Sequence, residues 1–150
     1  MRKLMKRFKK LKNERGLTLV ELLAVIVILA IVAIIAFVFI GGVIENSKKD
    51  AHISNAMQII QAAKLHEATG GDVNEMTVGK LQEKDYLDVI YDPWTKDEYG
   101  NDAMNAKITK EKGLLKINNF KDSGGNCNIT ATEQELSKKD RDELCKKETE

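Results

Sequence analysis

The hydrophobic pattern divides the chain at about residue 44. No polar side chain occurs from Leu22 to Ile44. As a helix this run spans about 35 Å at 1.5 Å per residue, enough to cross a bilayer hydrocarbon core of about 30 Å. The run is longer than the apolar part of a secretory signal. We therefore predict a helix that stays in the membrane.

The chain turns polar after residue 44 without a turn signal, so we expect the helix to continue to about Thr69. Apolar side chains recur there on one face, as in a helix that packs on a domain from one side: Ile53, Ala56, Met57, Ile60 and Ala63. Gly70 and Gly71 are expected to end the helix. His52 and His66 lie about 21 Å apart along its axis, too far to share a metal, and we predict solvated surface histidines.

The remaining residues predict a small antiparallel sheet packed on the helix, which gives an α+β fold. We expect a short helix capped by Thr77, a strand, a hairpin with a glycine-containing loop and a polar C-terminal helix, at residues 77–84, 86–91, 106–117 and 132–144 respectively. With 150 residues, the chain has room for one domain beyond the membrane segment.

Charge is distributed unevenly along the chain. Residues 1–16 carry +7 and the whole chain carries +1, so residues 17–150 carry −6. A basic end before an apolar span stays in the cytoplasm, which predicts the N-terminus inside and the C-terminus outside. The negative remainder disfavours broad binding to nucleic acid, although Lys107, Lys110, Lys112 and Lys116 could form a local basic strip.

Cys127 and Cys145 both lie in the part predicted to be outside, where thiols are oxidised. We predict a disulfide between them, worth about 3 kcal/mol on the chain-entropy model, with two unpaired thiols as the alternative. The sequence offers no further ligands for a tetrahedral metal site around them.

The residues before the apolar run form a motif. Gly16-Leu17-Thr18-Leu19-Val20-Glu21 follows a basic leader and precedes the long aliphatic stretch. This order resembles the N-terminus of type IV pilins and pseudopilins, and we expect a Gram-positive pilin-like protein or a competence or secretion pseudopilin. The resemblance implies a leader at residues 1–16, a membrane and filament-core helix at 17–44, and an extracytoplasmic head at 45–150.

In that family, prepilin peptidase cuts after the glycine and methylates the new N-terminus. Carried over, the cut falls between Gly16 and Leu17, and Leu17 is methylated. Glu21 is then expected to pair with the new amine of a neighbouring subunit and so to specify the register of assembly. The alternative is a carboxylate that reaches the headgroups or is protonated. The chain departs from the family pattern in having leucine after the cut and no proline in the apolar helix.

The turn at Asp92-Pro93-Trp94 also resembles one found in some secretion pseudopilins that hold calcium. The candidate ligands would be Asp92, Asp97, Asn101 and Asp102. Calcium needs six to eight oxygens, and this spacing is not that of a helix-loop-helix site. We favour a solvated turn with a packed tryptophan, and predict no cofactor.

We find no arrangement of residues that predicts an enzyme. The expected function is a structural subunit of a pilus or pseudopilus, held in the cytoplasmic membrane and then assembled at the cell surface. Its implied partners are other copies or related pilins, the prepilin peptidase, and the assembly platform with its ATPase. Two alternatives are a single-span membrane protein that presents a small binding module, and a competence pseudopilin acting in DNA uptake. We do not expect DNA to be a direct partner.

Overall fold

The structure is a computed structural model that describes the backbone of residues 2–146 and the side chains of residues 18–146. It divides into two compact units, residues 1–43 and 44–150, each described here by itself. Helix α1, Arg2–Ala68, contributes to both units. The division lies one residue before the expected end of the apolar segment at Ile44.

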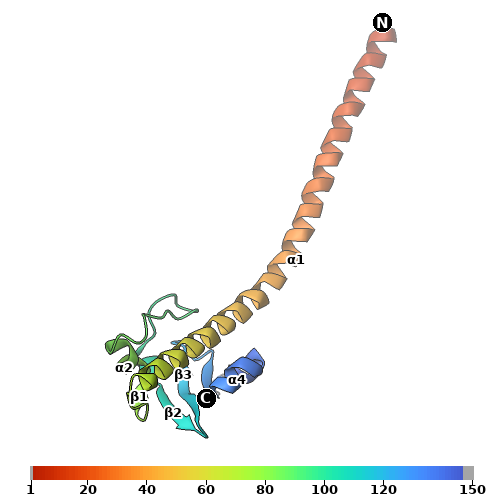
Figure 1. Cartoon of the computed structure of the whole chain (residues 1–150). Helices are drawn as coiled ribbons and strands as arrows, with labels where there is room; N and C mark the ends of the chain where they lie inside the picture. The colour runs from red at the N-terminus through yellow and green to blue at the C-terminus, as the bar shows by residue number, and fades with distance from the viewer. Residues whose placement is uncertain (1, 147–150) are drawn as a thin grey trace. The chain divides into compact units, whose positions relative to one another are not determined.

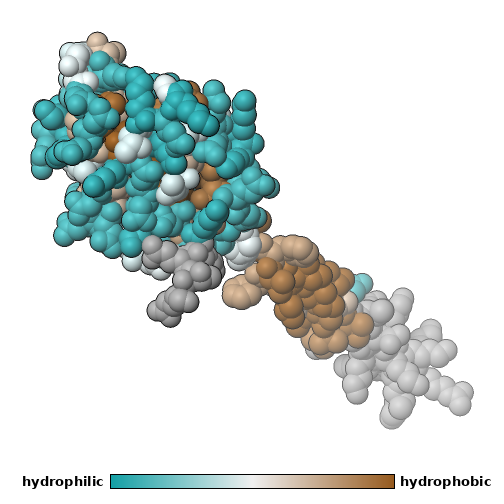
Figure 2. Space-filling model, turned by 90° about the horizontal axis from the view of Figure 1, so that it is seen from below, coloured by the Kyte–Doolittle hydropathy of each residue, from teal (hydrophilic) through white to brown (hydrophobic). Residues whose placement is uncertain are grey.

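The first unit contains only part of α1. Its large apolar side chains are exposed all around the helix, from 50% for Val27 to 84% for Phe37. Figure 2 shows this segment as a continuous hydrophobic surface, whereas the head is mostly hydrophilic on the face in view. Since a helix that is apolar on all sides is stable only when surrounded by lipid or protein, this segment requires a cover.

The second unit is an α+β head, as predicted. Its four antiparallel strands follow the order β1-β2-β3-β4, with β1 at Met76–Thr77, β2 at Lys107–Glu111, β3 at Leu114–Lys121 and β4 at Asn128–Thr132. Short helices complete it: α2 at Val78–Glu83, α3 at Asn101–Met104, α4 at Glu133–Lys138 and α5 at Arg141–Leu144. In Figure 1 the last turns of α1 run beside the sheet.

The core lies between α1 and the sheet. Its fully buried side chains are contributed by α1, α2 and the three longer strands: Ala56, Ile59, Ala63, Val78, Leu81, Ile108, Ile117, Phe120 and Ile129. Of the predicted helix stripe, Ala56, Ile60 and Ala63 are buried, and Ile53 and Met57 pack against the core. The predicted amphipathic helix is therefore confirmed.

Local chemistry explains several boundaries. Helix α1 ends before Gly70, whose φ of 89° suits glycine, and the Gly71 N–H donates to the His66 carbonyl. The Thr77 side chain accepts from the Lys80 N–H and caps α2, as expected. The predicted hairpin is β2–β3, and its two-residue loop has positive φ at Lys112 and Gly113, the backbone of a type I′ turn.

Two predicted elements are wrong. Residues 86–91 form no strand: the Tyr86 and Leu87 N–H groups donate to the Leu81 carbonyl, and Tyr91 makes only a single bridge with Glu98. The polar helix at 132–144 is two short helices. Lys139 has an extended backbone, which ends α4. The Asp140 side chain then accepts from the Arg141 N–H and caps the start of α5.

Candidate assembly segment and head surface

The predicted processing site lies within α1. Gly16 and Leu17 belong to this helix, but their side chains lie outside the described residues. Cleavage there and methylation of Leu17 stay predictions.

Glu21 is the acidic residue that precedes the exposed apolar surface. Its side chain is exposed, and it has no hydrogen-bond or ion-pair partner among residues 18–146. In a bilayer or a packed helix bundle, a carboxylate at this position would need a partner that residues 18–146 do not supply.

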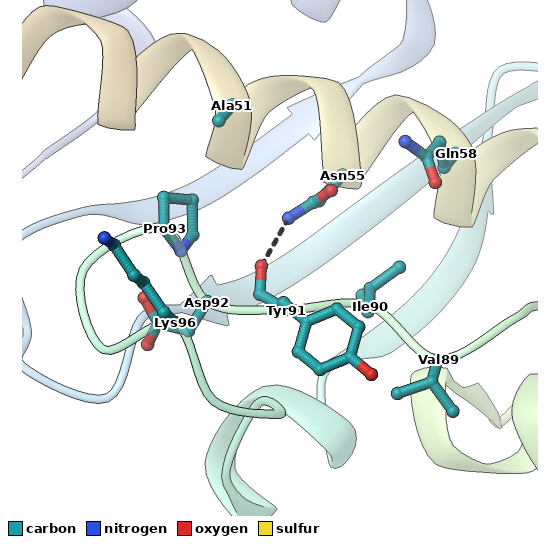
Figure 3. A pocket seen from close by; sticks show the side chains of 9 residues that line it. All are labelled: Ala51, Asn55, Gln58, Val89, Ile90, Tyr91, Asp92, Pro93 and Lys96. Atoms are coloured by element: carbon teal, nitrogen blue, oxygen red, sulfur yellow. Dashed lines mark hydrogen bonds between the residues drawn. The ribbon is translucent and has the colours of Figure 1, made fainter.

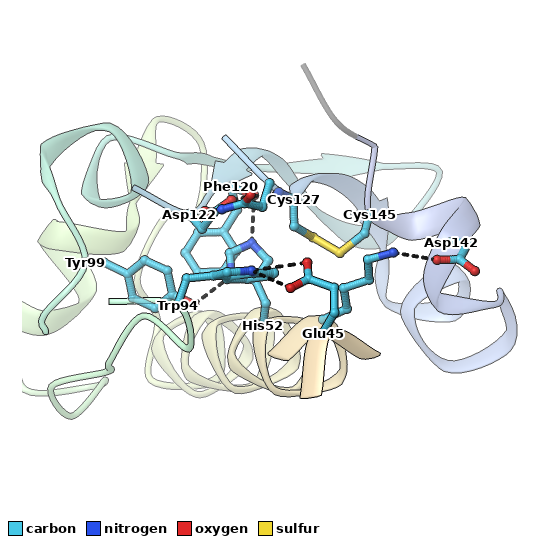
Figure 4. The surroundings of a disulfide bond; sticks show 11 residues. Glu45, His52, Trp94, Tyr99, Phe120, Asp122, Cys127, Asp142 and Cys145 are labelled. Atoms are coloured by element: carbon cyan, nitrogen blue, oxygen red, sulfur yellow. Dashed lines mark hydrogen bonds and ion pairs between the residues drawn. A yellow bond between two sulfur atoms is a disulfide. The ribbon is translucent and has the colours of Figure 1, made fainter. Parts of the chain in front are cut away.

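The head contains a buried polar network around His52, which is 0% exposed. Its ring stacks on Phe120 with a centroid distance of 4.5 Å. The His52 Nε2 lies 3.3 Å from the Phe120 carbonyl, which can only accept, so Nε2 is the donor. The Tyr99 hydroxyl lies 2.6 Å from Nδ1 and donates to it, while Asn55 Nδ2 donates to the Tyr99 hydroxyl at 3.0 Å. Figure 4 shows His52, Tyr99 and Phe120 of this network near the disulfide.

The surroundings of His52 favour a neutral ring. Burial lowers its pKa, although the carbonyl of Phe120 and the nearby charges of Asp122 and Asp92 act in the opposite direction. The prediction of solvated histidines is thus wrong for His52, and it is also wrong for His66, which is 7% exposed and packs edge-on against Tyr86. The apolar stripe of α1 could have predicted this burial. His52 lies four residues before Ala56 and His66 lies three residues after Ala63, so both fall on the buried face of the helix.

Asp92 has a structural role in the turn that was considered for calcium. It is 0% exposed, and its two carboxylate oxygens accept from the N–H groups of Trp94 at 2.9 Å and Ser123 at 2.8 Å. Burial alone would raise the pKa of Asp92, but these bonds outweigh it and the pKa lies below its ordinary value.

The other calcium candidates do not converge on Asp92. Asp97 is exposed, and Asp102 is exposed and lies 3.5 Å from the Lys121 ammonium. Within the described part of the chain, no group of three or more His, Cys, Asp or Glu side chains could hold a metal.

The turn and α1 border a groove on the head. Figure 3 shows its lining, with Asn55 Nδ2 donating to the Tyr91 carbonyl at 3.1 Å across it. Helix α1 forms one wall of the groove with Ala51, Asn55 and Gln58. The turn and the segment that leads into it form the other wall: Val89, Ile90, Tyr91, Asp92, Pro93 and Lys96.

The C-terminal segment is fastened to the head at several points. Cys127 and Cys145 form the expected disulfide, with a Cα–Cα distance of 4.6 Å. Exposed ion pairs join α5 to α1, from Asp142 to Lys49 at 2.7 Å and from Arg141 to Asp50 at 3.1 Å. The cross-link and these pairs hold α5 against the helix.

The predicted basic strip is partly neutralised. Lys110 pairs with Glu67, and Lys116 pairs with Glu111 at 2.8 Å. This leaves less free positive charge for a phosphate backbone than the sequence pattern indicated.

A single apolar helix in front of a small α+β head defines a membrane-anchored subunit whose helix must be covered by lipid or by other helices. Residues 11–37 match the family described as the Prokaryotic N-terminal methylation motif, a stretch that includes Gly16, Leu17 and Glu21. This match supports the resemblance of the N-terminal segment to type IV pilins and pseudopilins, whose members are structural proteins. No curated protein and no solved structure matches the chain.

Proposed function

We propose that the protein is a structural subunit of a type IV pilus or pseudopilus filament. It is made as a membrane-anchored precursor with its N-terminus in the cytoplasm, and prepilin peptidase cuts it between Gly16 and Leu17. The observation that carries the proposal is the methylation motif, followed directly by an apolar helix whose large side chains are exposed within the described part of the chain.

Charge explains why cutting and assembly belong together. Cutting after Gly16 creates a positive α-amine at Leu17, four residues from Glu21. A neighbouring subunit that is shifted along the helix axis brings its amine beside this carboxylate. At about 4 Å and an effective dielectric constant of 20, the attraction is about 4 kcal/mol before desolvation, so a missing partner is costly. Before cleavage the basic leader occupies this end of the helix and no such amine exists.

The apolar side chains contribute mainly through close packing. Lipid tails are as apolar as leucine, so moving the helix from lipid into a bundle gains little from hydrophobic burial. Packing, the charge pair and the assembly ATPase must therefore drive extraction. We infer that Glu21 selects the register and that the apolar helix supplies the cohesion.

The test replaces Glu21 with glutamine in cells that carry the peptidase and the assembly machinery. We expect normal insertion and processing but severe loss of sheared filaments. Asp102→Asn is the matched control, because it makes the same chemical change at an exposed head position and should leave filament yield unchanged. Normal filament yield from Glu21→Gln would refute the register role.

The main alternative is a single-span membrane protein that retains its leader and presents the head as a binding module. It would show no processing at Gly16. A competence pseudopilin that captures DNA is less favoured, because Lys110 and Lys116 are already paired with carboxylates.

A further inference from the structure

The end of the apolar run indicates where the head meets the membrane. Glu45 is the first polar side chain after Ile44. We place Glu21 at the inner edge of the hydrocarbon core, which is about 30 Å thick. The apolar helix is about 35 Å long, so it ends roughly 5 Å beyond the outer edge of the core. Each headgroup layer is roughly 5–8 Å thick, so Glu45 falls within the outer one.

Glu45 is joined to a distant part of the head. The Trp94 indole N–H donates to the two oxygens of the Glu45 carboxylate, at 3.2 and 3.3 Å, across 49 positions of sequence. The Trp94 ring is half-buried and meets His52 edge-on at 5.8 Å. Figure 4 shows the two hydrogen bonds from the indole to Glu45. Trp94 is therefore held beside the residue that follows the span.

The turn that carries Trp94 is closed by its own hydrogen bonds. The Asp92 N–H donates to the Asp97 carbonyl, and the Lys96 N–H donates to the Asp92 carbonyl, both at 2.8 Å. Figure 3 shows Pro93 and Lys96 on the Ala51 side of the groove, away from Gln58. Lys96 is exposed. The turn is thus a preformed surface rather than a loop that must be ordered on contact.

This combination matches the chemistry of the headgroup layer. Tryptophan is enriched there because its ring is apolar while its N–H needs a polar partner, which Glu45 provides here. An exposed lysine nearby suits anionic headgroups. We propose that Trp94 and the turn Asp92–Lys96 are the part of the head that contacts the lipid headgroups of the outer leaflet before the subunit is assembled. The inference rests on the membrane anchoring in the proposed function.

Trp94 is the only tryptophan in the chain, so its fluorescence reports this position alone. The full chain is reconstituted into vesicles of phosphatidylcholine and anionic phosphatidylglycerol that contain a quencher either on the headgroup or deep in the acyl chain. We expect loss of Trp94 emission with the headgroup quencher and little loss with the deep one.

The matched control moves the probe. Trp94→Phe combined with Leu65→Trp places the only indole at a position of α1 that is 55% exposed. This position lies about 30 Å along the helix from Glu45. Its emission should not respond to the headgroup quencher. Circular dichroism of both proteins establishes that the head is folded.

The outcomes separate the inference from the proposed function. Vesicle flotation measures anchoring on the same samples. If the protein floats with the vesicles but Trp94 emission is unaffected, or is quenched no more than the probe at position 65, the contact is refuted while anchoring stands. If the protein does not float, anchoring fails and the inference fails with it.

Discussion

The disulfide between Cys127 and Cys145 should supply a large part of the stability of the head. It closes a loop with a sequence separation of 18, for which chain entropy predicts about 3 kcal/mol. Net stabilities of ordinary domains are about 5–15 kcal/mol, so this is a substantial fraction. Cys127 is 0% and Cys145 6% exposed, so replacing both with alanine also removes buried sulfur and should cost somewhat more than reduction alone.

The assay is urea unfolding of the full chain in detergent, oxidised and reduced, followed by Trp94 emission. With a slope of about 2 kcal/mol/M, a loss of about 3 kcal/mol lowers the midpoint by about 1.5 M. Asp142→Asn is the control: it removes an exposed ion pair between α5 and α1 but keeps the cross-link, so its midpoint should barely change. An unchanged midpoint after reduction, with both thiols verified as free, would refute the reasoning.

Three further predictions concern the buried face of α1, and urea unfolding measures each. Gly71→Ala should destabilise the head by about 1–3 kcal/mol, because its Cβ would lie 2.2 Å from ring atoms of the buried His66; equal stability would contradict this packing. Tyr99→Phe should cost about 1–3 kcal/mol, since it leaves the buried Nδ1 of His52 without its donor, and a neutral effect would exclude that bond. Because the pKa of His52 is lowered from 6.5, only the unfolded chain binds its proton at mildly acidic pH. Stability should therefore be complete above about pH 6.5 and fall as the pH drops further, with a weaker dependence in His52→Gln.

Several features of the fold could be predicted because their causes are local. The glycine pair that ends α1, the Thr77 cap and the β2–β3 hairpin each depend on residues within a few positions of one another. The exposed apolar helix followed from length and composition alone. The strand expected at 86–91 failed for the complementary reason: its β-branched and aromatic residues favour a strand, but no strand within residues 2–146 pairs with it.

The interactions that shape the head surface connect residues far apart in sequence. His52 is buried because Phe120 and Tyr99 close over it, and neither can be paired with it from a single sequence. Trp94 could be predicted to pack, but not to bond with Glu45. At the assembly segment, the sequence was more informative than the structure of one chain, because the partner proposed for Glu21 belongs to another copy.

The account depends most on processing before assembly. The direct measurement is intact-mass and N-terminal peptide mass spectrometry of filaments sheared from cells that express the full chain. We predict a chain that begins at Leu17, with the mass of residues 1–16 missing and a methyl group on the new amine. Filaments, or membrane-extracted protein from cells with active peptidase, in which the chain still begins at Met1 would contradict the central claim.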